Sequence, residues 1–249
     1  MENTIEIREC TTLDELAECV NLQREVFALP EVELSPVRHF VVTRNAGGFT
    51  LGAYHGDRLA GYVLSVPAFL RGEKAFYSHM TGVRQEYQST GIGRRLKWAQ
   101  RERALELGVK FIKWTFEPVK ARNGYFNLEK LGAIVTEYER NFYGTDYAVS
   151  PESSQQIGLQ SDRLFAEWHL ESDKVRTLAA GFAWTETRTP EAEVATINNW
   201  SELVEHDPAA ALELQLRVRE GFESALARDL HAAAFRRDDV EPKYLMFRQ

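Results

Sequence analysis

The sequence predicts an α+β fold with three layers, in which helices flank a mixed, mostly antiparallel sheet, followed by a C-terminal α/β extension. Residues 74–84, KAFYSHMTGVR, mix aromatic and branched side chains as strands do, and they lead through a glycine-containing turn into an amphipathic helix over 91–107. Apolar strands over 49–55 and 59–66 are joined by a Gly-Asp pair typical of hairpins. The third observation is the alternation of helical and extended patterns along the rest of the chain.

Helix start and stop signals set the elements that precede the hairpin. A strand is expected over Ile5–Arg8, and Thr12 with Glu15 forms a capping box that opens a helix running to about Ala28. Further signals are Pro30 as the end of that helix, Ser35 and Pro36 as the cap of a helix over Val37–Arg44, and Gly47-Gly48 as its end.

The helix over 91–107 is expected to bury one side and to expose its basic residues. Its apolar side comprises Ile92, Leu96, Ala99, Arg103 and Leu107, whereas Arg94, Arg95, Lys97 and Arg101 lie elsewhere. Gly108 ends this helix. The next elements are a strand over Val109–Phe116, a helix over Ala121–Leu131 closed by Gly132, and strands over 133–143 and 162–170 separated by the polar loop 144–161.

The extension begins after residue 170, so we expect one domain over 1–170 and an extension over 171–249. Its expected elements are a helix over Asp173–Ala180, an extended segment over Ala192–Ile197, a long helix over Pro208–Phe235 and a strand over Tyr244–Phe247. Thr185–Pro190 is the linker candidate. Arg217, Arg219 and Arg228 on the long helix form surface pairs or bind an anionic group.

Bulk properties exclude several function classes. Of 249 residues, 37 are acidic and 30 basic, and a net charge of −7 argues against nucleic acid as the main partner. No apolar stretch is long enough for a membrane span, and the first residues lack the features of a signal peptide. The only two cysteines, Cys10 and Cys19, favour a reducing, cytoplasmic location, and no spacing suggests a metal site.

The turn at Gln88–Gly93 has the composition of a phosphate-binding loop, because glycines at a helix start turn backbone amides outward and the helix dipole attracts anions. A P-loop needs Lys and then Ser or Thr after its last glycine, where Arg94 and Arg95 stand, and the dinucleotide fingerprint is only half present. The remaining pattern, QxxGxG after a strand, resembles that of the GNAT superfamily of acyl-CoA-dependent N-acyltransferases. Leu128–Ala133, LEKLGA, is similar to a second family motif at the expected distance.

The resemblance, which spans roughly residues 5–170, implies acetyl-CoA or another acyl-CoA as co-substrate, no metal, and a homodimer as in many relatives. In this family the turn wraps the pyrophosphate of coenzyme A, and the strand before it contacts the acyl carbonyl and the pantetheine arm at positions matching Met80–Val83. The expected cofactor-binding residues are therefore Thr81, Gly82, Val83, Gln88, Ser89, Thr90, Gly91, Ile92, Gly93, Arg94, Asn123 and Asn127. Arg95 and Lys97 are further candidates for phosphate contacts.

Transfer of an acyl group to an amine needs a base for the amine proton, an oxyanion donor and, for some thiolates, an acid. Strand alternation places Tyr77, His79 and Thr81 on one face, and His79 is the first candidate for the base, with Glu117 as its rival. A structural role competes with catalysis at both positions. The family's acidic Tyr corresponds to Leu128 here, so Tyr125, or alternatively Tyr143, is the expected substitute.

We therefore expect an N-acyltransferase that moves an acetyl group, or a larger group such as succinyl, to a primary amine. A small molecule such as an amino acid is the preferred acceptor, and a protein amino group remains open. The alternatives are an acyl-CoA-binding or regulatory module without catalysis, and an unrelated nucleotide-binding protein.

Overall fold

The computed structural model describes residues 4–27, 29, 31–146 and 158–248. The chain divides into two compact units, Met1–Lys113 and Trp114–Gln249. The boundary falls within strand β5 (Phe111–Phe116), so this strand contributes residues to both units. The described elements combine helices with a mostly antiparallel sheet, and the expected fold class is confirmed.

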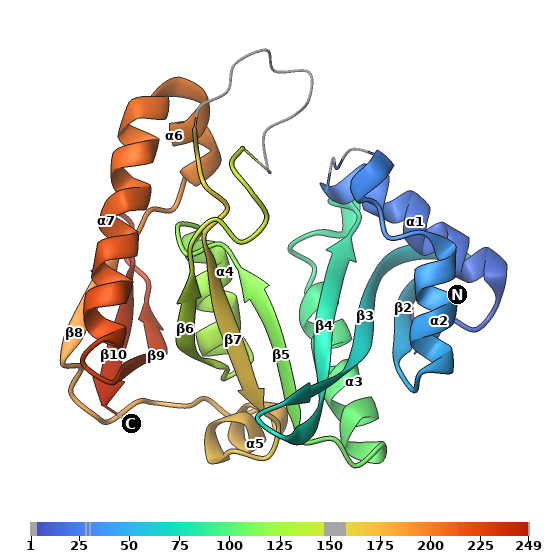
Figure 1. Ribbon diagram of the computed structural model, residues 1–249. Helices are drawn as coiled ribbons and strands as arrows, with labels where there is room; N and C mark the ends of the chain where they lie inside the picture. The colour runs from blue at the N-terminus through green and yellow to red at the C-terminus, as the bar shows by residue number, and fades with distance from the viewer. Residues whose placement is uncertain (1–3, 28, 30, 147–157, 249) are drawn as a thin grey trace. The chain divides into compact units, whose positions relative to one another are not determined.

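The first unit contains a sheet in the order β1-β2-β3-β4-β5 (Figure 1). Neighbouring strands are antiparallel except β4 and β5, which pair in parallel at Phe76–Ile112 and Tyr77–Lys113. The expected hairpin is present, and β3 extends further than the sequence pattern indicates. The strands are β1 (Ile5–Glu9), β2 (Phe49–His55), β3 (Arg58–Leu70) and β4 (Glu73–Val83).

Helices cover both faces of this sheet. Tyr62 and Leu64 of β3 pack with α1 (Leu13–Phe27) and α2 (Val37–Asn45), whereas a Cβ added at the intervening Gly61 would meet Leu96 of α3 (Ile92–Glu106) at 3.3 Å. Because successive strand residues point to opposite faces, α1 and α2 cover one face and α3 covers the other.

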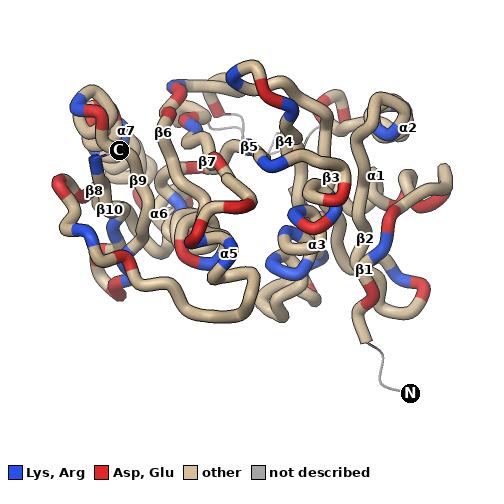
Figure 2. Tube along the Cα trace, turned by 90° about the horizontal axis from the view of Figure 1, so that it is seen from below, with Lys and Arg blue, Asp and Glu red and all other residues tan. Residues whose placement is uncertain are grey.

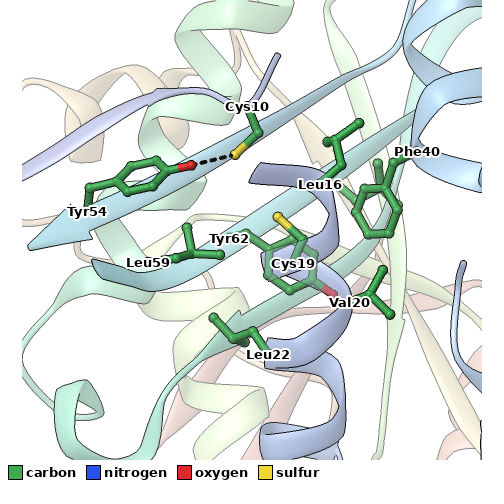
Figure 3. Close-up of a cluster of buried hydrophobic side chains, with 10 residues drawn as sticks. Cys10, Leu16, Cys19, Val20, Leu22, Phe40, Tyr54, Leu59 and Tyr62 are labelled. Atoms are coloured by element: carbon green, nitrogen blue, oxygen red, sulfur yellow. Dashed lines mark hydrogen bonds between the residues drawn. The ribbon is translucent and has the colours of Figure 1, made fainter. Parts of the chain in front are cut away.

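A buried cluster fastens α1 and α2 to the sheet (Figure 3). In it, the thiol of Cys10 lies 3.3 Å from the hydroxyl of Tyr54, and the free thiol of Cys19 is fully buried. The cluster comprises Cys10, Leu16, Cys19, Val20, Leu22, Phe40, Tyr54, Leu59, Tyr62 and Leu64. Burial of this apolar surface, at about 25 cal/mol per Å², is the main force that holds the helices on the strands.

The expected capping box of α1 is confirmed, since the Glu15 amide donates to Thr12 Oγ1 at 3.2 Å and the Thr12 amide donates to Glu15 Oε2 at 2.9 Å. The expected stop signals at Ala28 and Pro30 lie outside the described residues. At α2, Pro36 occupies the cap position without a side-chain cap bond, so a capping role for Ser35 is wrong. The Ser35 hydroxyl instead contacts His79.

The expected faces of α3 are wrong in part. Lys97 and Arg101 are buried, whereas Leu107 is exposed. Lys97 Nζ donates to Ser78 Oγ of β4 at 3.0 Å and to Gln100 Oε1 of α3 itself at 2.7 Å, so buried polar groups accept an amphipathic side chain that the periodic pattern assigns to solvent.

The second unit continues the strand order from β5 through β7, β6, β9 and β10 to β8. Its strands are β6 (Ile134–Glu139), β7 (Arg163–His169), β8 (Ala192–Ala195), β9 (Leu230–Arg236) and β10 (Lys243–Arg248). Its helices are α4 (Ala121–Tyr125), which continues as a π-helical turn (Phe126–Lys130), α5 (Asp173–Ala179), α6 (Trp200–His206) and α7 (Pro208–Leu226). Pairing of Val135 with Ala232 joins β6 to β9, so the extension adds strands to the unit's sheet.

The expectation of one helix over Pro208–Phe235 is wrong. Helix α7 ends at Leu226, Asp229 adopts a left-handed φ of 58°, and β9 follows as a buried strand. The Ala-rich sequence of β9 favours a helix locally, but pairing with β10 and β6 in the interior overrides that propensity. Helix α6 was not anticipated from the sequence. The expected domain boundary at residue 170 stays a prediction.

Polar side chains fasten α7 to the segment before β7. Arg219 Nε and Nη2 each donate to an oxygen of Asp162 at 2.9 Å, and Gln215 Nε2 donates to the carbonyl of Gln160 at 2.6 Å. Asp162 also accepts hydrogen bonds from the Tyr138 hydroxyl and the Asn141 amide. Because the Asp162 side chain is fully buried, Arg219 neutralises a charge that has no access to water.

None of the described helices combines the length and the apolarity that crossing a bilayer requires.

We predict that Arg219→Met lowers the free energy of unfolding by about 3 kcal/mol, because it leaves the buried Asp162 carboxylate with only neutral hydrogen-bond donors. Arg217→Met on the exposed side of the same helix is the matched control and should change stability by less than about 0.5 kcal/mol. Urea unfolding followed by circular dichroism measures both variants. Equal stabilities for the two variants would contradict a structural role for Arg219.

Candidate active site

The turn before α3 presents unpaired backbone amides. Ser89 and Gly91 have left-handed φ angles of 64° and 90°, and Gly91 is the N-cap residue of α3. Within the described part of the chain, the amides of residues 89–94 donate to no protein acceptor. Unpaired amides at a helix start, together with the positive end of the helix dipole, form a binding site for a phosphate group.

Side chains around the turn hold its conformation. Gln88 Nε2 donates to the carbonyl of Val83 at 3.1 Å, and Thr90 Oγ1 donates to the carbonyl of Tyr87 at 2.7 Å. The buried guanidinium of Arg84 donates to the Leu59 carbonyl at 2.7 Å and pairs with Glu25. The Gln88 amide donates to the carbonyl of Gln85 at 3.1 Å, so of Gln88 and Thr90 only Thr90 keeps a backbone amide for a ligand.

Basic residues recur along α3 (Figure 2), but they differ in their surroundings. Arg94 is exposed beside the turn, whereas Arg95 Nη2 donates to the carbonyl of Ile5 at 2.7 Å. Desolvation lowers the pKa of the buried Lys97 well below its ordinary value. Arg94 is therefore the side chain of these three that is placed to meet a phosphate.

Strand β4 carries a bulge at His79. Ser78 pairs with Ser65 and Met80 pairs with Leu64, so His79 is the extra residue of β4. Tyr77 pairs with Val66 and Thr81 with Val63, which places Tyr77 and Thr81 on opposite faces. The expectation that they share one face with His79 is wrong, because strict alternation fails at a bulge.

The bulge presents the His79 imidazole to α2 and the segment before it. Its Nε2 lies 3.1 Å from the Ser35 hydroxyl, and its ring meets the His39 ring edge-on at a centroid distance of 5.5 Å. Desolvation and, to a smaller degree, His39 lower the pKa of His79 below 6.5. The imidazole is thus neutral at pH 7 and able to accept a proton.

In the second unit, Glu117 follows β5 and lies between two cations. Lys120 Nζ is 2.6 Å and Arg163 Nη1 is 3.2 Å from its carboxylate oxygens, and the Glu117 side chain is only 20% exposed. Burial alone raises its pKa and is the largest single influence, but Lys120 and Arg163 together outweigh it and lower the pKa. A paired carboxylate of lowered pKa is a weak proton acceptor, which favours His79 over Glu117 as the base.

Tyr125 lies at the junction of α4 and the π-helical turn. Lys130 Nζ is 5.1 Å and Arg237 Cζ is 5.0 Å from the centroid of its ring. The wider π-helical turn brings a residue five positions later to the same side. Hydrogen bonding from Lys130 and then the contribution of Arg237 lower the pKa of the phenol, which makes Tyr125 a stronger acid than an ordinary tyrosine.

The other expected residues of this helix have different surroundings. Asn127 is buried and accepts a hydrogen bond from Trp114 Nε1 at 3.2 Å, an interaction that serves packing. Asn123 is half-buried in the first turn. Leu128 is fully buried, and Tyr143, the alternative acid, lies 3.4 Å from the Thr115 hydroxyl through its own hydroxyl.

Sequence reasoning missed Ser35 and His39 beside His79, and Lys120, Arg163 and Arg237 beside Glu117 and Tyr125. Only Lys120, three residues after Glu117, had a local signal in its spacing. The other four are distant in sequence from the groups that they contact, so no periodic pattern marks them. No cluster of three or more potential metal ligands occurs in the described residues.

Comparison with protein families matches residues 13–133 to the Acetyltransferase (GNAT) family. The matched segment includes the hairpin, β4, the phosphate turn, α3 and the helix with the second motif. The chain carries a GNAT-family acetyltransferase domain. The resemblance read from the two motifs is thereby confirmed.

Solved structures agree with the fold of this GNAT domain. A GNAT-family protein from Desulfovibrio desulfuricans aligns over 67% of this chain and 99% of its own at 14% identity, with a TM-score of 0.55. The ribosomal-protein-S18-alanine N-acetyltransferase from Escherichia coli aligns over 66% of this chain and 93% of its own at 15% identity, with a TM-score of 0.51. Both leave about a third of this chain unmatched, and a comparison with curated proteins found no match.

We predict that His79→Ala in this GNAT domain lowers kcat by 10²- to 10⁴-fold, the usual range for loss of a general base. Protonation of His79 below its lowered pKa should produce an acid limb below pH 6.5 in the kcat profile, and the variant should lack it. His39→Phe removes one cause of the lowered pKa and should move the limb to higher pH. An unchanged rate and limb in His79→Ala would exclude this base.

We also predict that Arg237→Gln raises the pKa of Tyr125, because the phenolate loses a neighbouring cation. The measurement is an ultraviolet titration of phenolate, with Tyr125→Phe identifying the signal of this residue. Arg236→Gln, which removes a neighbouring exposed cation that pairs with Glu193, is the matched control and should leave the signal in place. The same titration curve in both variants would contradict an effect of Arg237.

Proposed function

We propose that the protein is an N-acyltransferase that moves an acetyl or other acyl group from coenzyme A to the primary amine of a small molecule. The observation that carries the proposal is the set of unpaired amides at residues 89–94, ahead of the helix dipole of α3. A pyrophosphate satisfies several such amides at once. The expected acyl-CoA then places its phosphates at this turn, beside the exposed Arg94.

The remaining roles follow the chemistry of thioester aminolysis. The amine nitrogen attacks the thioester carbonyl, the carbon–sulfur bond breaks, and the amine proton goes to a base. We assign the base to His79 and the proton donor to the leaving thiolate to Tyr125, with Met80–Val83 as backbone contacts for the acyl carbonyl and the pantetheine arm. The lowered pKa of His79 supports its role because it keeps the imidazole in the neutral, proton-accepting form at pH 7, and the lowered pKa of Tyr125 brings this acid closer to neutral pH.

The acceptor is the least constrained part of the proposal. The name of the similar Escherichia coli enzyme gives an alanine of a ribosomal protein as its acceptor, and that acceptor is a property of that enzyme and not of this chain. The buried free thiols of Cys10 and Cys19 support a reducing, cytoplasmic location as part of the proposal. A homodimer stays a prediction drawn from the family.

A second candidate is an acyl-CoA-binding module without catalysis. The fully buried Leu128 favours it, because this position holds the acidic tyrosine in many members of the family and leucine cannot donate a proton. Release of free thiol from acetyl-CoA in the presence of a panel of amines distinguishes an enzyme from such a module.

The test of the cofactor site is Gly93→Asp. A Cβ at Gly93 meets only Val83 Cγ2 at 3.8 Å, an ordinary contact, and an acidic side chain in the first helical turn favours the helix. We therefore expect a folded variant whose affinity for acetyl-CoA falls at least about 100-fold, because the carboxylate competes with the phosphates for the same amides.

Leu107→Asp at the exposed C-terminal end of the same helix is the matched control and should retain affinity within about twofold. Calorimetry with acetyl-CoA measures both variants, and circular dichroism reports their folding. Full affinity in a folded Gly93→Asp protein would refute the proposed cofactor site.

A further inference from the structure

The second unit contains a cavity of about 220 Å³ that is lined in part by the C-terminal extension. Its lining includes charged residues, among them Glu117, Lys120 and Arg163, and apolar ones, among them Leu159, Trp200 and Val204. Trp200 and Val204 belong to α6, outside the segment that matches the family. The unit therefore contains a pocket, smaller than the usual sites for drug-sized ligands, whose apolar lining comes partly from the extension.

Each carboxylate in the described part of the lining already has a cation or a hydrogen-bond donor as its partner. Glu117 is held by Lys120 and Arg163, and the two oxygens of Asp162 are held by Arg219. Asp146 accepts hydrogen bonds from the Gly158 and Leu159 amides at 3.0 and 3.1 Å. Among the described lining residues, no carboxylate thus lacks a partner with which to bind an ammonium group.

Arg163, in contrast to these carboxylates, has a polar group without a hydrogen-bond partner among the described residues. Its Nη1 meets Glu117, and its guanidinium lies 5.0 Å from the centroid of the Tyr143 ring, but its buried Nε–H has no hydrogen-bond acceptor among the described residues. The side chain is 90% buried, so water satisfies this donor poorly. Around Glu117 there are two cations for one carboxylate, which leaves an excess positive charge at this end. An anionic ligand oxygen in the cavity would compensate this excess charge.

We propose that this cavity binds the acyl acceptor by its carboxylate, and that the acceptor is a small amine of the class of apolar α-amino acids. The carboxylate meets the two cations of the lining, Lys120 and Arg163, and the apolar side chain packs toward Trp200 and Val204. An unpaired carboxylate near the amine would stabilise its charged ammonium form, which cannot attack the thioester. The absence of such a carboxylate in the described lining therefore suits catalysis. The inference rests on the proposed function only in naming the ligand an acceptor.

Gln215 and Arg219 of α7 support the cavity from behind. They hold Gln160 and Asp162 and thereby fasten the start of β7, which carries Arg163. The extension accordingly contributes both part of the apolar wall and the fixed position of the anion-binding arginine.

The binding test uses the full chain without acyl-CoA and compares L-phenylalanine and L-leucine with their primary amides by calorimetry. Each pair has the same amine and side chain and differs in the carboxylate charge. We expect the amino acids to bind at least about tenfold more tightly than the amides, since hydrogen bonds to charged groups are the stronger class. Equal affinities within each pair, or no binding by either amino acid, would overturn the proposal.

Two variants locate the site. Arg163→Gln should weaken amino-acid binding at least about tenfold, with the exposed Arg140→Gln as its control. Val204→Trp should fill the apolar side and abolish binding without touching the ionic groups, with the exposed Val240→Trp as its control. Should Arg163→Gln fail to fold, Arg163→Lys retains the charge without the planar guanidinium that binds carboxylates through two parallel bonds, and should still weaken binding. Unchanged binding in Val204→Trp would overturn the proposal.

A thiol-release assay separates this inference from the proposed function. Transfer from acetyl-CoA to amines that Val204→Trp does not impair would refute the cavity as the acceptor site and leave the acyltransferase intact. Charge-selective binding of amino acids that depends on Arg163, without any thiol release, would refute the acyltransferase and its acceptor together, and leave only a binding site for amino acids.

Discussion

The β-bulge at His79, which shifts the pairing of β3 with β4 by one residue, is the constraint on which the first unit depends. Before the bulge, Ser78 faces α3, where the Lys97 and Gln100 side chains meet its hydroxyl, whereas Met80 after the bulge packs on the side of α1 and α2. The extra residue accordingly leaves the ladder and presents its imidazole to Ser35. A bulge thus aims a titratable side chain out of a sheet while the strand remains paired on both sides of it.

In each unit, the pKa values of titratable groups are set by their neighbours within that unit. His79 is kept neutral by desolvation and by a second imidazole on α2, and Tyr125 is made more acidic by two cations. Glu117 is kept ionised by Lys120 and Arg163 against the cost of burial. Environment, more than residue type, therefore distinguishes a base, an acid and a paired structural carboxylate in one protein.

The C-terminal extension is part of the second unit's architecture. Its strands β9, β10 and β8 extend the sheet that contains β6 and β7, and α7 is fastened by the buried pair of Arg219 with Asp162. Because breaking a buried pair leaves an uncompensated charge, this contact specifies the position of the helix more strictly than apolar packing alone. The same contact orders the segment that carries Arg163.

The sequence by itself determined the features that depend on neighbouring residues. They include the capping box of α1, the hairpin, the left-handed Gly91 before α3, and the two motifs that identify the GNAT domain. Tertiary structure decided that 230–236 forms a strand, that Lys97 is buried, and that Arg163 reaches Glu117. Local patterns report propensity and amphipathicity over a few residues, whereas strand pairing, bulges and ion pairs depend on which distant segments meet, and a periodic pattern contains no record of that.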